Sequence, residues 1–376
     1  MKIADGYMLY SMEGTNYLLP VGQTIALRKK GLRLNNTGAL LWNAIKSGLE
    51  EKDLLTYLAS HYQAGEAELP TLQADISTFL RQLTDRQLIR REEKPSACSF
   101  YMNIGDLTIG YYGPPHLLHP SLLDFECSPG PVGQHWIILP QPPVPYPLGE
   151  VIIRTEEIEI IKNTEDYIIT LLTMSPSVQI KLSLDGVYAR FYCTPPYDKN
   201  HIDVFFQAFR HAFLPYAQKH GLFVFHSSSV LYQDKAWLFS APSGTGKSTQ
   251  ADYWNKLYHT RILNGDLNMV RLQAPAPIVT GLPWCGTSHI YNNETYPLGG
   301  IVLLKKHKEN IAVQLTKTEQ ELSAVQRLIS PAWTEEMLTN NLKFSHELVK
   351  HIPVFRFLCK KEPLAAHTLR QYIHQL

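Results

Sequence analysis

Cysteine is scarce in this sequence, and the few cysteines present form no pattern. Cys98, Cys127, Cys193, Cys285 and Cys359 are scattered and odd in number, with no Cys-x-x-Cys pair. Such usage argues against a disulfide framework and against a zinc site. We therefore expect reduced thiols in a cytoplasmic protein.

Long apolar runs and a strong net charge are also absent. No run approaches the length of a membrane span, and the N-terminus lacks the apolar core of a signal peptide. The net charge of +1 gives no reason to expect nucleic acid or an anionic membrane as the main partner. The remaining composition, 44% hydrophobic and 18% charged over 376 residues, predicts a globular chain of two or three domains.

What the sequence does contain is a glycine-rich loop between a strand and a helix. The loop Ser243-Gly244-Thr245-Gly246-Lys247-Ser248-Thr249 follows the apolar run 236–240 and precedes a helix-like segment at 250–258. Glycines at these positions let backbone N–H groups surround an anion, and the N-terminus of the helix adds its positive dipole end. This context predicts a phosphate-binding loop; the alternative is a capping turn with a chance Gly-Lys-Ser.

The side chains of the loop predict ATP and Mg²⁺ as its ligands. Lys247 can reach the β- and γ-phosphates, and the hydroxyl of Ser248 or Thr249 can bind the metal. Ala241 stands where the pattern usually has its first glycine, and alanine keeps that position small.

Residues 1–93 form the first expected domain. Short strands at 7–10 and 16–19 are joined by Glu13-Gly14, and a third strand begins at Leu32. Three helices follow, and the last carries Leu72, Ile76 and Phe79 at helical spacing. This order predicts a winged-helix-like domain.

The same residues carry a resemblance to a known family. The segments 34–42, 54–62 and 75–89, with Leu34-Asn35-Asn36-Thr37-Gly38 at their start, resemble the PqqD family of precursor-peptide recognition domains. The resemblance implies that a leader peptide adds as an extra strand to the small sheet and packs on the third helix. A precursor peptide is the partner that this domain implies.

The alternative for this domain is a DNA-binding winged helix. The third helical segment, 66–83, contains Arg81 as its one cation, against Glu66, Glu68 and Asp75. Such a helix would repel phosphates, so the charge pattern favours a peptide over nucleic acid.

Residues 94–200 are expected to form a β-rich segment packed on the half of the chain that follows. A polar linker at 90–96 leads into it, and a proline string at 140–147 predicts an extended connector. Asp185-Gly186 between two alternating runs predicts a hairpin.

Residues 201–376 form the expected nucleotide-binding domain. An aromatic-rich helix ends at Gly221 and is followed by a strand that contains His226. A lone histidine on an apolar strand is commonly a core residue. However, the segment His226-Ser227-Ser228-Ser229, taken with the loop that starts at Ser243, resembles the HPr kinase/phosphorylase family and its relative, ATP-dependent phosphoenolpyruvate carboxykinase. That resemblance implies that His226 lies near the transferred phosphate and the metal.

Asp266 is the acidic residue expected at this site. It ends the segment 261–266, which we expect to be a hydrophobic strand that delivers a carboxylate to Mg²⁺. The family has two adjacent aspartates here, whereas this sequence has Gly265 in place of the first, which is the one usually regarded as the base. The general base is therefore open between Asp266 and His226, and a surface aspartate remains an alternative.

A second glycine-flanked loop, 280–288, contains Trp284-Cys285 and precedes the apolar run 297–304. This loop fits a lid that faces substrate or nucleotide. The sequence fits a packed turn equally well.

Together these features predict an α+β multidomain chain. A PqqD-like domain, a β-rich middle and an HPr-kinase-like α/β domain would make an ATP-dependent kinase for a Ser or Thr hydroxyl of a ribosomally made precursor peptide. The expected catalytic residues are His226, Lys247 and Asp266, and the expected metal ligands are Ser248 and Asp266. The alternatives are a nucleotide-sensing leader chaperone without phosphotransfer and a small-molecule kinase; the oligomeric state is left open.

Overall fold

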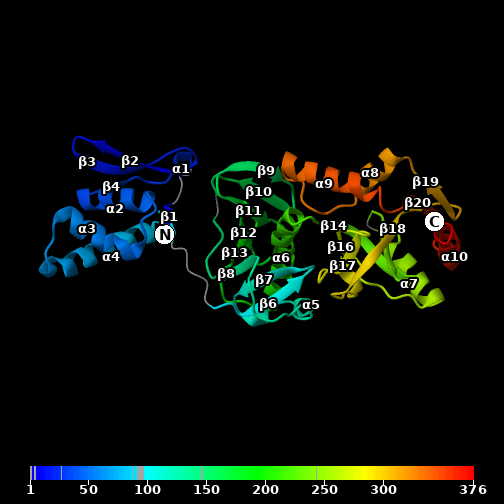
Figure 1. Cartoon of the computed structure of the whole chain (residues 1–376). Coiled ribbons are helices and arrows are strands. Elements are labelled where there is room, and N and C mark those ends of the chain that lie inside the picture. Colours follow the sequence, from blue (N-terminus) through cyan, green and yellow to red (C-terminus); the bar gives the residue numbers. More distant parts are fainter. Residues whose placement is uncertain are drawn as a thin grey trace. The chain divides into compact units, whose positions relative to one another are not determined.

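The chain divides into two compact units, residues 1–95 and 96–376, in the computed structural model of the protein (Figure 1). The structure describes the chain apart from residues 1, 4–5, 27, 87, 91–96, 145–146 and 243, and apart from the side chains at 2, 23, 84, 85 and 90. The expected linker at 90–96 falls almost entirely outside the described residues. Each unit is presented by itself.

The first unit contains a small antiparallel sheet covered on one face by helices. Its strands are β2 (Tyr7–Met12), β3 (Thr15–Pro20) and β4 (Leu32–Leu34), in the order β2-β3-β4. Glu13 and Gly14 have positive φ angles of 50° and 75°, so they make the tight turn that the sequence predicted. Within the described residues, β2 and β4 are the two edges of this sheet and pair with no further strand.

Three main helices complete the core of this unit. The Asn35 side chain accepts a hydrogen bond from Gly38 N and so begins the first of them, and Leu18, Trp42 and Leu80 are fully or almost fully buried. The helices and remaining strands are α1 (Gln23–Ala26), α2 (Asn36–Lys46), α3 (Leu54–Tyr62), α4 (Leu69–Asp85), β1 (Lys2–Ile3) and β5 (Ile89–Arg90), with short 3₁₀ turns at Glu51–Asp53 and Glu66–Glu68.

The second unit begins with an eight-stranded sheet. The strand order is β6-β7-β8-β13-β12-β11-β10-β9, with the β12–β13 hairpin at the expected Asp185-Gly186 turn. Its strands are β6 (Phe100–Ile104), β7 (Leu107–Tyr112), β8 (Gln134–Leu139), β9 (Glu150–Arg154), β10 (Ile158–Lys162), β11 (Asp166–Leu171), β12 (Gln179–Ser183) and β13 (Tyr188–Tyr192), with α5 (Pro120–Leu123) and a 3₁₀ turn at Pro115–Leu117 between β7 and β8.

One long helix, α6 (Lys199–Lys219), connects this sheet to the rest of the unit. Its aromatic face packs into a core that takes residues from both sheets, among them Trp136 of β8 and Val224 of β14 (Figure 1). Residues 96–200 and the part of the chain that follows them therefore share one hydrophobic core, and a single compact unit results.

A seven-stranded sheet forms the centre of the second half. Its order is β15-β14-β16-β17-β18-β20-β19, and an additional parallel pairing of β15 with β18 closes five of these strands into a ring. The strands are β14 (Leu222–Tyr232), β15 (Lys235–Ser240), β16 (Leu267–Arg271), β17 (Ile278–Gly281), β18 (Thr295–Lys306), β19 (Ile311–Gln314) and β20 (Val354–Cys359).

Helices cover both faces of this sheet. Side chains of α8 (Lys317–Val325) and α9 (Glu335–Leu348) join one core cluster, while side chains of α7 (Lys247–Tyr258) and α10 (Pro363–Ile373) join the other. In β15, Leu238 belongs to the first cluster and Phe239 to the second. Because both faces of β15 are buried, its sequence is a continuous apolar run and does not alternate between apolar and polar residues.

Among the described residues, no helix combines the length and the apolar character that a membrane crossing requires.

Candidate phosphate-binding and acid–base site

The glycine-rich loop lies between β15 and α7, as the sequence predicted. Gly244 and Gly246 have φ angles of 72° and 117°, in the left-handed region that glycine tolerates best. The helix begins at Lys247 rather than near Gln250, so Lys247, Ser248 and Thr249 occupy its first turn. Ser243, one of the expected loop residues, lies outside the described part of the chain, and Thr245 N donates to Pro242 O at 3.2 Å.

The space around this loop fits a phosphate group. A Cβ atom added at Gly244 would meet nothing within 4 Å, so among the described residues no side chain distant in sequence occupies the space beside this glycine. Within the described residues, the backbone N–H groups of Ser248 and Thr249 donate no hydrogen bond. Free amides at a helix N-terminus are suited to bind an anion, and the triphosphate of a nucleotide supplies one.

Three of the expected site residues come together beside the loop. The Nε2 atom of His226 lies 3.0 Å from the Asp266 carboxylate oxygen Oδ1 and 3.0 Å from the ammonium nitrogen of Lys247. Nε2 can donate a proton to Asp266 or accept one from Lys247, but it cannot do both at once. The tautomer of His226 therefore decides which of its two neighbours it binds.

Electrostatics keep Asp266 charged in this arrangement. The hydrogen bond from His226 lowers the pKa of Asp266, and the charges of His226, Lys247 and Arg210 act in the same direction against the opposing effect of burial. For Lys247, which is 8% exposed, burial lowers the pKa, and the nearby Arg327 adds to this while Asp266 opposes it. The poorly solvated Lys247 cation would be stabilised by an added anion such as a phosphate.

The expected strand at 261–266 is not formed, and this expectation was wrong. The segment makes a single bridge, Val230 with Ile262, and the next strand, β16, starts at Leu267 directly after Asp266. The reason is Asn264, whose side-chain oxygen accepts hydrogen bonds from Asp266 N and Leu267 N at 2.8 and 2.9 Å. Such an Asn-centred turn competes with strand pairing and places Asp266 before β16 rather than at the end of a strand.

Gly265 is held close to a neighbouring loop. A Cβ atom at this position would lie 2.0 Å from the Ser288 hydroxyl oxygen, and that hydroxyl donates to Cys285 O at 2.6 Å. The space that a first aspartate would need is therefore occupied by Ser288. Gly286, with a φ angle of 58°, lies against the other aspartate, since its Cβ would come within 3.0 Å of the Asp266 carboxyl carbon.

The loop 280–288 packs against α6. Trp284 is 2% exposed, its indole N–H donates to Phe206 O at 2.8 Å, and its rings stack on Phe206 and lie tilted against Phe213. The loop ends in the 3₁₀ turn Gly286–Ser288 beside Asp266. Of the two readings of this loop, the contacts favour the packed turn over a lid, and burial raises the pKa of the Cys285 thiol, which keeps it protonated and unreactive.

Two arginines near the site were not identified from the sequence. Arg327 O accepts from His226 N at 2.9 Å, and its buried Nε atom has no hydrogen-bond partner within the described chain. Arg210 of α6 interacts electrostatically with Asp266, and burial lowers the pKa of both guanidinium groups. An arginine one helical turn after Phe206, on an otherwise apolar face, was the available clue. With Lys247 they outnumber the single carboxylate, so the site is cationic and suited to phosphates.

The donor set also bears on Mg²⁺. Among the described residues no group of three or more His, Cys, Asp or Glu side chains could hold a metal ion. A hydroxyl from Ser248 and a carboxylate from Asp266 fit a magnesium ion that takes its other ligands from phosphate oxygens and water. Ser248 is exposed in the first turn of α7.

Comparisons with known proteins identify the first unit. Residues 8–89 match the family model described as "Coenzyme PQQ synthesis protein D (PqqD)". The N-terminal unit therefore contains a PqqD domain, and the chain as a whole is a mixed α+β protein with this domain at its N-terminus.

Two solved structures are similar to parts of the chain. "TbiB1 in Complex with the TbiA(beta) Leader Peptide" is 20% identical and covers 25% of this chain and 100% of its own, with a TM-score of 0.21. "Structure of the Hpr(Ser) kinase/phosphatase from Coxiella burnetii" is 7% identical and covers 40% of this chain and 91% of its own, with a TM-score of 0.25. Because both TM-scores are far below 0.5, the residues of this chain must carry any statement about function. No curated protein sequence matches this chain.

Proposed function

We propose that this protein is an ATP-dependent kinase that phosphorylates a Ser or Thr hydroxyl of a ribosomally made precursor peptide. One observation carries the proposal: the Lys247 ammonium, at an open glycine loop, lies 3.0 Å from His226, which lies 3.0 Å from Asp266. A phosphate-binding cation and an acid–base pair thus meet at one point. Phosphoryl transfer needs these two elements side by side.

Each residue has a distinct part in the proposed reaction. Lys247 and the amides of Ser248 and Thr249 hold the phosphates of ATP, and Arg327 adds a second cation on the side of Lys247. The acceptor hydroxyl attacks the γ-phosphorus while the bond to the β,γ-bridging oxygen breaks, and ADP leaves. Asp266 takes the hydroxyl proton, either directly or through His226. Mg²⁺, held by Ser248 and Asp266 when bound, would neutralise phosphate charge.

The PqqD domain supplies the precursor in this proposal. Its sheet ends at the free edge β4, next to the helical layer, and a leader peptide can pair with that edge as an added strand. Side chains on α4 would then select the leader sequence. Tethering raises the local concentration of the acceptor, so the kinase site can bind its target segment weakly.

The remaining parts of the proposal follow from composition. The acidic character of segment 66–83 and the net charge of +1 disfavour nucleic acid and anionic membranes as partners. Because its cysteines are scattered, we place the protein in the cytoplasm, where precursor peptides are made. Homo-oligomerisation is compatible with this function and not required by it.

The competing function is a leader chaperone that senses ATP without transferring phosphate. Gly265 favours it, because the aspartate usually regarded as the base is missing and Ser288 fills its space. A small-molecule kinase is a third reading, which the PqqD domain disfavours, since such an enzyme has no use for a peptide-binding unit.

The deciding experiment combines the full chain, ATP–Mg²⁺ and a precursor peptide whose leader binds residues 1–93. The kinase predicts a mass gain of about 80 Da per modified hydroxyl, read by mass spectrometry. Asp266→Asn should slow this reaction by about 10²-fold or more while ATP binding is retained. Tight ATP binding to the native chain with no mass gain would establish the chaperone instead.

A further inference from the structure

One cation beside the candidate site has no partner of its own. Arg210 of α6 is partly buried, and within the described residues its guanidinium makes no hydrogen bond and no ion pair. The carboxylate whose charge acts on it is Asp266, which is already bonded to His226 at 3.0 Å. A guanidinium that loses part of its hydration without gaining a hydrogen bond is unfavourable, so this position favours an anionic ligand.

The packing of α6 directs Arg210 toward the candidate site. Phe206, Arg210 and Phe213 follow one another at spacings of four and three residues, so they share one face of the helix. The rings of Phe206 and Phe213 both contact Trp284, at centroid distances of 5.8 and 5.4 Å. Arg210 therefore lies on the face of α6 that packs on the loop containing Trp284.

The same loop connects this face of α6 to Asp266. The Trp284 indole N–H donates to Phe206 O at 2.8 Å, one helical turn before Arg210. Further along the loop, a Cβ atom at Gly286 would lie 3.0 Å from the Asp266 carboxyl carbon. The loop therefore contacts both the carboxylate and the turn of α6 that carries Arg210. In agreement with this placement, the charge of Asp266 opposes the effect of burial on the pKa of Arg210.

The two arginines of the site act on different members of it. The charge of Arg327 lowers the pKa of Lys247 in the first turn of α7, whereas Arg210 acts on Asp266. In phosphoryl transfer the γ-phosphorus lies between the loop cation, which holds the β- and γ-phosphates, and the base beside the acceptor hydroxyl. A cation on the side of the base is therefore placed for the γ-phosphate rather than for the β-phosphate.

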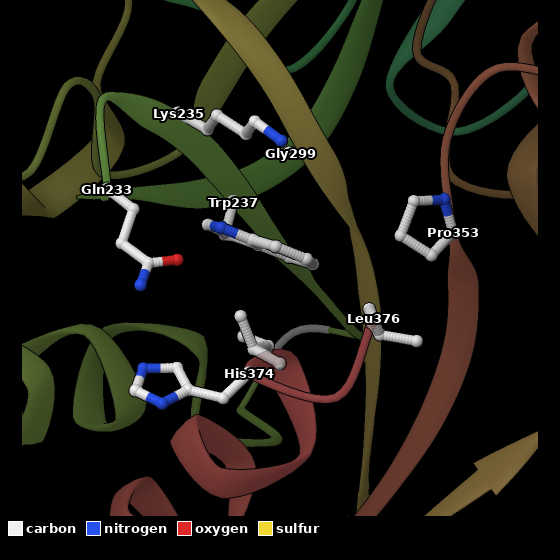
Figure 2. A pocket seen from close by; sticks show the side chains of 8 residues that line it. Gln233, Lys235, Trp237, Gly299, Pro353, His374 and Leu376 are labelled. Atoms are coloured by element: carbon white, nitrogen blue, oxygen red, sulfur yellow. The ribbon is translucent and has the colours of Figure 1, made fainter.

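A hollow at the other end of β15 lacks these features. It measures about 380 Å³ and lies at the turn between β14 and β15 (Figure 2). Lys235 is the one lysine or arginine among the described residues that line it, and Trp237, at 5% exposed, offers no ring face to a nucleotide base. ATP is therefore assigned to the glycine-rich loop, where three cations gather.

We propose that Arg210 binds the γ-phosphate of ATP. Its guanidinium donates two parallel hydrogen bonds to oxygens of that phosphate, a geometry that the planar fork of arginine matches and an ammonium does not. Arg210 thus distinguishes ATP from ADP and stabilises the phosphoryl group during its transfer. The inference rests on the proposed function, because it takes ATP to be the ligand of the glycine-rich loop.

Isothermal titration calorimetry on the full chain with Mg²⁺, in the absence of peptide, tests this assignment. The probes are ADP and the β,γ-imido analogue of ATP, which carries a γ-phosphate and is not hydrolysed. Arg210→Gln should weaken binding of the imido analogue at least about 10-fold and change ADP binding less than about 2-fold, because a lost charge-assisted hydrogen bond affects only the nucleotide that makes it. Unchanged ADP binding also shows that the variant is folded.

A second variant and a matched control complete the series. Arg210→Lys keeps the charge and most of the volume, so it replaces the glutamine variant if that one does not fold. It should weaken binding of the imido analogue at least about 3-fold, since an ammonium cannot make the paired bonds. Arg154→Gln removes the same charge from an exposed arginine of β9, at the edge of the eight-stranded sheet, and should bind both nucleotides as the native chain does.

The outcomes separate this inference from the proposed function. Equal losses for the two nucleotides, or no loss for either, in a folded Arg210 variant overturn the assignment and leave the proposed kinase intact. A selective loss of the imido analogue, together with a native chain that transfers no phosphate to a precursor, supports Arg210 and contradicts the kinase. A native chain that binds neither nucleotide contradicts both.

Discussion

Gly265 shows at the scale of one residue why the site departs from the two-aspartate pattern. The Ser288 hydroxyl occupies the position that any side chain at 265 would need, and the same hydroxyl is bonded to Cys285 O. The glycine is therefore part of the packing between two loops. Its presence leaves Asp266 as the carboxylate at this point.

A substitution at this glycine tests that packing. Gly265→Ala should lower the free energy of unfolding by about 1–3 kcal/mol, because its Cβ would lie 2.0 Å from the Ser288 oxygen. In the double variant Gly265→Ala with Ser288→Gly the loss should be smaller than the sum of the two single losses. Urea unfolding measures all three.

The control for this series is Gly130→Ala. Its nearest neighbour would be Ser128 O at 4.0 Å, and its φ angle is not in the left-handed region, so it should not destabilise the chain. Equal losses at positions 130 and 265 would contradict the crowding at Ser288.

His211 gives a prediction for the dependence of stability on pH. Burial and the neighbouring Arg210 lower its pKa from 6.5 to about 4. The unfolded chain therefore binds this proton more readily than the folded chain, and stability should decrease as the pH falls from 6.5 toward 4. The full effect is about 3 kcal/mol. His211→Gln should flatten this part of the curve in urea unfolding at a series of pH values; an unchanged slope would refute the assignment.

At this scale the sequence identified the residues whose chemistry has a strong pattern. Gly244, Gly246 and Lys247 could be recognised because their spacing is needed to surround a phosphate, and His226 and Asp266 do lie together beside them. Arg210 and Arg327 could not be recognised, since they reach the site only through the packing of α6 and the pairing of residues 327–329 with β14.

The loop 280–288 is held on two sides: the Asn264 side-chain amide donates to Leu282 O and Trp284 O, and the Trp284 side chain packs on α6. Trp284 anchors it to α6 through the bond from its indole N–H to Phe206 O at 2.8 Å and through stacking on Phe206. The 3₁₀ turn that follows lies against Asp266. The stability of this anchor therefore affects the position of a candidate catalytic group.

Trp284→Phe should lower the free energy of unfolding by about 1–3 kcal/mol, because the Phe206 carbonyl loses its buried donor. Urea unfolding measures the loss. The matched control is Trp333→Phe at a half-buried tryptophan that packs edge-on against Tyr167 and makes no indole hydrogen bond within the described residues, so its loss should be smaller. A loss at 284 no greater than that at 333 would show that the bond to α6 is unimportant.

The positions of strands could not all be predicted from sequence patterns. The apolar run 236–240 became β15 because both of its faces are buried, whereas the apolar pair Ile262-Leu263 forms no strand. The difference lies in Asn264, whose side chain takes the amides of residues 266 and 267. Local side-chain bonds of this kind depend on the rotamer and cannot be read from hydropathy.

For the whole molecule, the proposed function assigns capture of the peptide to unit 1–95 and the chemistry to unit 96–376. If the PqqD domain holds the leader, deleting the leader from the precursor should slow phosphorylation by about 10²–10⁴-fold at micromolar substrate, because tethering is lost. Initial rates measured by mass spectrometry test this.

The control is a precursor with a scrambled leader of the same length and composition, which should be as slow as the leaderless one. Equal rates with and without the native leader would contradict the division of labour. The domain order could be inferred from sequence, since the two motifs lie far apart along the chain, but the shared core of residues 96–200 with α6 arises from long-range packing.

The ring closure of the central sheet has a consequence for biosynthesis. The strand that presents the glycine-rich loop pairs in parallel with β18, which in turn pairs with β20 near the end of the sequence. A nascent chain on the ribosome has no complete nucleotide-binding sheet until those late strands emerge. The N-terminal unit has all of its strands and helices long before then. Under the proposed function, a newly translated molecule would therefore be able to engage a leader peptide while it is still unable to consume ATP.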